Sequence, residues 1–214
     1  MHKNENNRLG PEVAATVHIV DDDMGVREAL RRVLRRAGYT VETHAGAAPF
    51  LEAYDGQPGC LILDLAMPKM RGEVLLGEIV ERNLNLVVLV LTGHATIRSA
   101  VRVTQLGAVD VLEKPVDHDL LLTKLREMRE VGRKAFARRA LAEDFHCRFD
   151  SLTHREKQVI ELLLAGLTSL EIGQRLGNSK KTIDIHRGRI MQKMGAASVT
   201  ELIMEWTSLS GEGF

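Results

Sequence analysis

A repeated alternation of short apolar runs with amphipathic segments in the first 114 residues is the feature that most constrains the fold of this chain. Apolar runs typical of buried strands occupy 17–20, 61–63, 86–91 and 109–112, with a weaker strand expected at 40–44. Residues 26–37 place apolar side chains on one helical face, and Gly38 follows as a C-terminal cap. This repetition predicts a doubly wound α/β domain whose mostly parallel sheet is covered on both faces.

Beyond residue 150 the pattern becomes wholly helical. A further helix is expected from about Ser179, because Gly177 and Asn178 provide a tight turn before it. Two helices joined by a short turn predict an all-α helix-turn-helix domain. Other helix starts are marked by Ser/Thr-x-x-Glu capping boxes at Thr153 with Glu156, Thr168 with Glu171, and Ser198 with Glu201.

These patterns divide the 214 residues into four parts. Residues 1–15 are polar and are expected to form a flexible N-terminal tail, and 16–130 form the α/β domain. Residues 131–150 are a charged linker, expected to be helical. The helix-turn-helix domain then occupies 151–214. A hydrophobic fraction of 44% is enough to build two modest cores.

The charge balance excludes a chain that is basic throughout. Lys plus Arg and Asp plus Glu are 29 each, so any charge that attracts nucleic acid must be local. Cys60 and Cys147 are far apart in the sequence and are expected to be reduced thiols, and the eight histidines form no paired ligand motif. No apolar run is long enough for a membrane span or a signal peptide, so we expect a cytoplasmic protein without membrane contact.

Acidic residues follow two of the expected strands at the edge where parallel strands end. Asp21, Asp22 and Asp23 come directly after the first strand, and Asp64 directly follows the run at 61–63. A single Asp at such a place is more often a turn or helix cap. Several carboxylates in a small space repel one another, so a hard cation, Mg²⁺, is expected among them.

Thr92 and Lys114 follow later apolar strands and bring a hydroxyl and a positive charge to the same edge. Together with the carboxylates they suit phosphoryl chemistry. In this order, with Pro115 after the lysine, the residues resemble the receiver domains of two-component response regulators over about 16–130. The resemblance implies a flavodoxin-like, five-stranded parallel sheet.

The resemblance also implies a role for each residue. Asp64 is expected to be the phosphoacceptor, phosphorylated by a cognate sensor histidine kinase that docks largely on the first helix. Lys114 would neutralise the phosphoryl group, and Thr92 would move towards it. The Lys114-Pro115 peptide is expected to be cis. The implied Mg²⁺ ligands are Asp21 through a water molecule, Asp22, Asp64 and the backbone carbonyl of Ala66.

One position departs from the receiver pattern. Val111 stands where these domains commonly have Tyr or Phe, three residues before the lysine, so the aromatic part of the switch is open to question. His94, two residues after Thr92, is either a solvated loop residue or a gate that shields the phosphoryl group from water.

The segment over most of 152–203 resembles the LuxR-type helix-turn-helix of NarL/FixJ response regulators. A helical projection of 179–194 places Ile183, Ile190 and Met194 on an inward stripe, with His186 and Arg187 at its margins. The opposite face is expected to enter the major groove of double-stranded promoter DNA. The expected DNA-binding residues are Lys180, Lys181, Thr182, Asp184, Ile185, Arg187, Arg189 and Gln192.

Ile185 is expected to contact a thymine methyl group, while Lys180 and Thr182 lie closer to the DNA backbone. Related domains often have lysines where Asp184 and Gly188 stand, which excludes base reading by a lysine at either position. Few phosphate contacts per subunit favour a homodimer on paired half-sites, formed when the chain is phosphorylated. The last helix, 199–206, packs on its own domain or pairs two domains.

Two other functions stay open at this point. A phosphatase of the haloacid dehalogenase type also forms an aspartyl phosphate, and Asp21 with Asp23 offers its Asp-x-Asp spacing. It would leave the helix-turn-helix unexplained. In the second alternative, the α/β domain dimerises without phosphorylation, an option that Val111 keeps open.

Overall fold

The computed structural model describes residues 16–68, 70–93 and 96–210. These residues divide into two compact units, with the boundary between Phe136 and Ala137. The expected tail at 1–15 and His94 lie outside the described residues. Within these residues no helix is long and apolar enough to cross a membrane. We describe each unit by itself.

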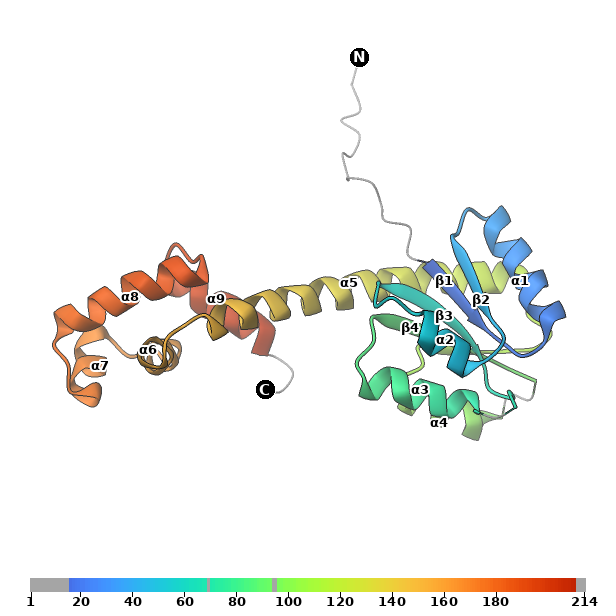
Figure 1. Ribbon diagram of the computed structural model, residues 1–214, viewed down its shortest axis with the longest axis horizontal. Helices are drawn as coiled ribbons and strands as arrows, with labels where there is room; N and C mark the ends of the chain where they lie inside the picture. Colours follow the sequence, from blue (N-terminus) through green and yellow to red (C-terminus); the bar gives the residue numbers. More distant parts are fainter. Residues whose placement is uncertain (1–15, 69, 94–95, 211–214) are drawn as a thin grey trace, which may run out of the picture. The chain divides into compact units, whose positions relative to one another are not determined.

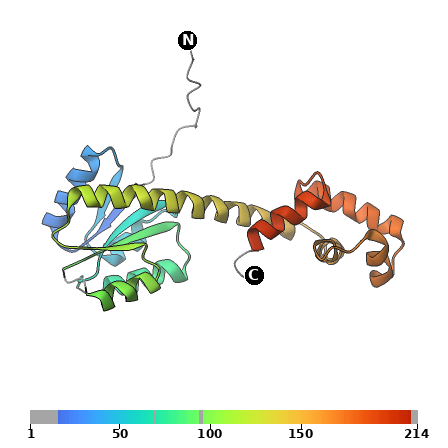
Figure 2. The same cartoon turned by 180° about the vertical axis from the view of Figure 1, so that it is seen from behind.

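The first unit is a sheet of five parallel strands covered by helices on both faces, as the sequence predicts (Figures 1 and 2). The strand order is β2-β1-β3-β4-β5. The elements, in chain order, are β1 (Thr16–Val20), α1 (Met24–Arg36), β2 (Val41–His44), α2 (Ala47–Ala53), β3 (Gly59–Asp64), α3 (Gly72–Glu81), β4 (Leu86–Thr92), α4 (Ile97–Gln105), β5 (Asp110–Glu113) and α5 (His118–Asp150).

Two hydrophobic cores lie on opposite faces of this sheet. One core joins the strands to α1 and α5, through side chains such as Leu34 and Leu125. The other joins them to α2, α3 and α4, through side chains such as Phe50, Leu75 and Val103. Both faces of β3 and β4 are therefore buried, which explains their continuous apolar sequence.

The strand register aligns the carboxyl ends of the strands. Val20, the last residue of β1, pairs with Leu63, so Asp64 and Asp21 follow at the same level. Asp64 pairs with Leu91, and Thr92 pairs with Glu113, which directly precedes Lys114. The order of the strands reverses between β1 and β3, and in doubly wound sheets this reversal is where functional groups gather.

The second unit is built from the end of α5 and four further helices of the described chain. These are α6 (His154–Leu164), α7 (Ser169–Leu176), α8 (Lys180–Met194) and α9 (Val199–Ser210). Their core includes Phe145 of α5, Ile172 of α7 and Leu202 of α9. The residues expected as a linker all lie within α5, and the boundary between the two units falls inside this helix.

Two of the three predicted capping boxes form completely. Thr153 and Glu156 cap α6, and Thr168 and Glu171 cap α7, with both side-chain bonds present in each. The third is different: the Ser198 hydroxyl accepts from the backbone of Glu201, whereas the Glu201 carboxylate accepts from Ala197 instead of Ser198. This carboxylate therefore satisfies a backbone donor one residue before the cap.

Candidate functional site

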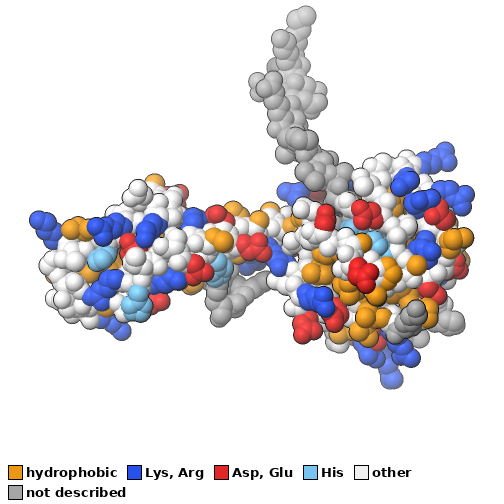
Figure 3. Space-filling model, viewed as in Figure 1, with side chains coloured by type: hydrophobic (Ala, Val, Ile, Leu, Met, Phe, Trp, Pro, Cys, Tyr) orange, Lys and Arg blue, Asp and Glu red, His pale blue; other side chains and the backbone are white. Residues whose placement is uncertain are grey.

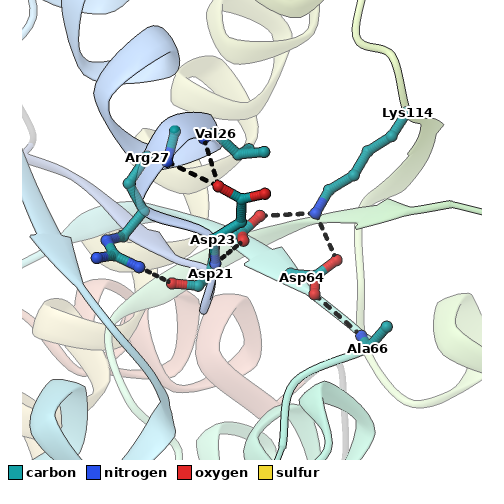
Figure 4. A network of polar contacts seen from close by, with 8 residues as sticks. Asp21, Asp23, Val26, Arg27, Asp64, Ala66 and Lys114 are labelled. Atoms are coloured by element: carbon teal, nitrogen blue, oxygen red, sulfur yellow. Dashed lines mark hydrogen bonds and ion pairs between the residues drawn. The ribbon is translucent and has the colours of Figure 1, made fainter.

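The carboxyl ends of β1 and β3 hold a cluster of acidic side chains with one lysine (Figure 4). The Nζ atom of Lys114 lies 2.7 Å from Oδ2 of Asp21 and 2.8 Å from Oδ1 of Asp64. Both carboxylates are almost fully buried, with exposed fractions of 1% and 3%, while Asp22 is exposed. One lysine thus bridges two buried carboxylates, which leaves an excess of negative charge.

The second oxygen of each buried carboxylate is held by the backbone. Oδ1 of Asp21 accepts from the amide of Asp23 at 2.9 Å, and Oδ2 of Asp64 accepts from the amide of Ala66 at 3.1 Å. Oxygens of Asp21, Asp22 and Asp64 lie within 4.8 Å of one another. This all-oxygen donor set is the kind that binds a hard divalent cation.

Burial raises the pKa of Asp21 above its ordinary value, although hydrogen bonds from Lys114 and the Asp23 amide act in the opposite direction. The pKa of Lys114 is also raised: burial lowers it, but hydrogen bonds to Asp21 and Asp64 outweigh that effect. The lysine therefore stays charged, and Asp21 is held in a site where its own charge is costly.

Thr92 and the peptide after Lys114 complete this edge of the sheet. Thr92 ends β4 and is buried, and its carbonyl accepts from the amide of Lys114 at 2.8 Å. The Lys114-Pro115 peptide is cis, which confirms the expectation. Val111 is half-buried and packs against the core shared with α2, α3 and α4.

Asp23 has a different task from the other members of its triplet. Its Oδ1 accepts from the amides of Gly25 at 2.7 Å and Val26 at 3.2 Å, so it is the N-cap of α1. Helix capping occupies the Asp23 carboxylate, so the geometry does not support the hypothesis that Asp21 and Asp23 form the Asp-x-Asp motif of a phosphatase.

Two residues of this site were not singled out from the sequence. Arg27 in α1 donates through Nη1 to the carbonyl of Asp21 at 2.6 Å, and thereby fixes the backbone at the end of β1. Gly72 begins α3 against the backbone carbonyl of Asp64, where a Cβ atom would collide. An arginine in an amphipathic helix and a glycine at a helix start are common, so neither gave a usable signal.

In the second unit, α8 separates buried and exposed residues as the helical projection predicts. Ile183, Ile190 and Met194 are fully buried. Ile185 is 51% exposed among polar neighbours. Of the predicted DNA-binding residues, those whose side chains are exposed on α8 are Lys180, Lys181, Asp184, Ile185, Arg189 and Gln192.

The other two predicted DNA-binding residues are partly engaged within the unit. Arg187 donates to the hydroxyl of Ser169 at 2.6 Å and lies 3.9 Å from Asp184. The hydroxyl of Thr182 lies 2.8 Å from that of Ser179, the N-cap of α8. Basic side chains are visible along this part of the second unit in Figure 3, and α8 has five Lys or Arg residues against one Asp.

Two protein-family models match the chain. The response regulator receiver domain matches residues 17–126, and the bacterial regulatory proteins of the luxR family match residues 150–206. These two ranges correspond to the sheet unit and to the helical unit.

Curated relatives match over most of the chain. The transcriptional regulatory protein FixJ of Azorhizobium caulinodans is 39% identical over 194 residues, which cover 87% of this chain and 89% of that protein. The tetrathionate response regulatory protein TtrR of Salmonella typhimurium is 34% identical over 197 residues, with coverage of 92% and 94%.

Solved structures agree with this result. The response regulator StyR matches with a TM-score of 0.77 and 36% identity, covering 91% of this chain and 99% of that chain. Full-length FixJ from B. japonicum matches with a TM-score of 0.56 and 34% identity, covering 93% and 98%.

Proposed function

We propose that this chain, which belongs to the NarL/FixJ family of response regulators, controls transcription through phosphorylation of Asp64 by a cognate sensor histidine kinase. The observation that carries the proposal is the position of Lys114, whose ammonium group contacts both Asp64 and Asp21. A phosphoryl group on Asp64 would meet this cation and the hydroxyl-bearing Thr92 at the same edge of the sheet. The chain is therefore a phosphoacceptor switch whose output is DNA binding.

Mg²⁺ fits the acidic cluster. Asp21, Asp22 and Asp64 would hold it, with the backbone at Ala66 as a further oxygen donor. When bound, the ion supplies positive charge for phosphoryl oxygens. Lys114 alone cannot balance three carboxylates, and this deficit supports a requirement for the cation.

The energy of phosphorylation is sufficient for a conformational switch. The modification adds nearly two negative charges and new acceptor oxygens. Each charge-assisted hydrogen bond contributes ~1.5–3 kcal/mol, while turning a 1:99 equilibrium into 99:1 requires ~5.5 kcal/mol. Two or three new contacts at Lys114 and Thr92 therefore suffice.

Apolar side chains on α4 and before β5 support dimerisation of the first unit. Ile97 is 87% exposed, and Val101 on the same helix and Val109 before β5 are also exposed. α4 follows Thr92 in the chain, so a movement of Thr92 towards a phosphoryl group would displace its start. We propose that phosphorylation reshapes this surface, pairs two chains and frees the helix-turn-helix for DNA.

Promoter recognition is assigned to the exposed face of α8. Ile185 would contact a thymine methyl group, and Lys181 and Gln192 would address base edges or phosphates. Lys180 lies near the helix N-terminus, where backbone amides also favour a phosphate. Dimerisation would place two such helices on paired half-sites.

The test uses the full chain, a small-molecule phosphodonor such as acetyl phosphate, and Mg²⁺. Intact-mass analysis, gel filtration and binding to promoter DNA are compared for the wild type, Asp64→Asn and Asp23→Asn. Asp23→Asn is the matched control, because Asn is also a good N-cap. We expect a phosphoryl adduct, dimerisation and tighter DNA binding in the wild type and the control, and none of these responses in Asp64→Asn.

The alternatives give different results. Equal dimerisation and DNA binding by Asp64→Asn and the wild type, both with the phosphodonor, would contradict the proposal and favour a dimerisation module independent of phosphorylation. Phosphatase turnover that survives in Asp64→Asn but not in Asp21→Asn would favour the enzyme.

A further inference from the structure

Two histidines and one glutamate on β1 and β2 lie close together in the first unit. His18 pairs in register with Glu42, and His44 lies two residues further along β2, so the three side chains share one face of the sheet. One potential ligand atom from each lies within 4.8 Å of the other two. Nδ1 of His18 is 3.4 Å from Oε2 of Glu42.

Both histidines are buried, and each has a nitrogen without a hydrogen-bond partner. His18 is 4% exposed and His44 is 8% exposed. Nδ1 of His18 and Nε2 of His44 have no hydrogen-bond partner, although each is fully shielded from solvent. A buried polar atom without a partner costs free energy, so these two nitrogens require an explanation.

The surroundings favour the neutral form of both rings. Burial lowers the pKa of His18, although Glu42 and Asp55 act in the opposite direction. Burial also lowers the pKa of His44, and His18 adds to this effect. Neutral imidazole has the free lone pair that binds a metal ion, so metal binding would not have to displace a proton near neutral pH.

We propose that His18, Glu42 and His44 bind one divalent transition-metal ion, with Zn²⁺ as the fitting probe. Two imidazoles and a carboxylate are a ligand set that zinc accepts. At bond lengths of about 2.0–2.1 Å, a tetrahedral ion holds its ligand atoms about 3.4 Å apart, which is the distance between His18 and Glu42. His44 offers a third ligand atom within 4.8 Å of the ligand atoms of the other two.

An ion can reach this site from solvent. The side chain of Glu42 is 53% exposed. His18 and Glu42 also line a cavity of about 540 Å³ in the first unit, near the starts of β1 and β3. Since a catalytic or labile site keeps an open position, a water molecule from this cavity can supply the fourth ligand.

Ring packing alone is the competing explanation. The centroid of His18 lies 5.5 Å from that of Phe50 and 5.8 Å from that of Tyr54, so the histidines could serve as core aromatic residues. Packing does not explain why a carboxylate lies 3.4 Å from Nδ1 of His18, or why the buried Nε2 of His44 has no hydrogen-bond partner. Rings of Phe or Tyr would fill the same space without that cost.

The test is a calorimetric titration of the full chain with Zn²⁺ in excess Mg²⁺, followed by Co²⁺ absorption spectroscopy. We expect one equivalent of Zn²⁺ to bind and Co²⁺ to show a spectrum of nitrogen and oxygen ligands. Glu42→Gln should lower the affinity by a factor of about 10 or more. His44→Gln should lower it further, and circular dichroism checks its fold. Glu42→Gln changes an exposed side chain, so its result does not depend on refolding of the core.

Two controls identify the site. Glu52→Gln changes another exposed glutamate and should bind Zn²⁺ like the wild type. Asp22→Asn should also keep the affinity, because the acidic cluster is a separate site. The proposal is overturned by any of four results: no binding, affinity unchanged in Glu42→Gln, binding lost in Asp22→Asn, or a thiolate-to-cobalt band that places the ion at the exposed Cys147.

Discussion

Each unit of the molecule contains a buried carboxylate paired with a lysine, and the two pairs differ in a way that separates function from stability. Lys114 contacts Asp21 at 2.7 Å in the first unit, and Lys193 contacts Glu156 at 2.7 Å in the second. Both carboxylates are buried. Nevertheless, the pKa of Asp21 is raised, whereas that of Glu156 is lowered to about 2.

The surroundings of each pair explain the difference. Lys193 is the cation that Glu156 contacts, and the amide of Thr153 donates to the same carboxylate within the capping box of α6. For Asp21, burial is the main cause of the raised pKa; Lys114 is also shared with Asp64, whose charge further opposes ionisation of Asp21. A balanced pair holds helices together, while a pair short of positive charge is suited to receive a ligand.

The largest difference between the two pairs is expected when the lysine is removed from each. We expect Lys114→Met to slow phosphoryl uptake from acetyl phosphate by a factor of about 10²–10³, because it removes a preorganised charge from the reacting group. Lys193→Met should leave the rate unchanged. Intact-mass analysis over time measures both rates, and equal rates in the two variants would contradict the distinction.

The next largest effect concerns the stability of the second unit. Glu156→Gln keeps a capping residue but removes the charge that pairs with Lys193. A pKa of about 2 instead of 4.5 corresponds to about 3 kcal/mol of unfolding free energy. Because the Lys193 side chain is 35% exposed, solvent screening reduces the loss expected in Glu156→Gln to about 2 kcal/mol. Urea unfolding, followed by fluorescence of the single tryptophan, Trp206 in α9, measures this loss. An equal midpoint for variant and wild type would contradict this prediction.

Acidic pH should remove the difference in unfolding free energy between the wild type and Glu156→Gln. Because the folded-state pKa of Glu156 is depressed, its contribution is fully present above pH 4.5 and is lost as the pH falls towards 2. The gap in unfolding free energy between the wild type and Glu156→Gln should therefore shrink over this window. The same urea titrations at several pH values test this, with Glu161→Gln, an exposed glutamate on the same helix, as a control. A gap that stays constant to pH 2 would rule out the ion pair as its source.

The smallest expected effect is on the stability of the first unit. Since the pKa of Asp21 is raised, its ionised form destabilises the fold at neutral pH. Asp21→Asn should thus leave the first unit equally stable or slightly more stable, even though it impairs the site. Hydrogen exchange of amides in β1 and β3 is the measurement. Faster exchange in the variant would show that this pair is structural after all.

Most of the fold was predictable because apolar runs and helix caps are local signals. The strands at 86–91 and 109–112 were found to within one residue, and Thr153 and Thr168 cap the expected helices. The acidic edge was also predictable, because residues that directly follow buried parallel strands must meet. The separation of buried and exposed residues on α8 followed from helical periodicity.

What escaped prediction depends on contacts between distant parts of the chain. The approach of Gly72 to the backbone of Asp64 and the bond from Arg27 to Asp21 have no sequence pattern. His18 and His44 are 26 positions apart, far from any metal-ligand spacing, and only the pairing of β1 with β2 brings them together. The absence of a paired histidine motif in the sequence therefore did not reveal that His18 and His44 lie close together in the fold.

The three consecutive aspartates after β1 are chemically identical, yet each lies in a different environment. The first is buried beside Lys114, the second faces solvent, and the third caps α1. The division of labour is fixed by where the strand stops and the helix starts, so these positions are not interchangeable. Shortening the triplet by one residue would leave a sequence that still ends the strand in two acids, but one of the three tasks would have no residue to perform it.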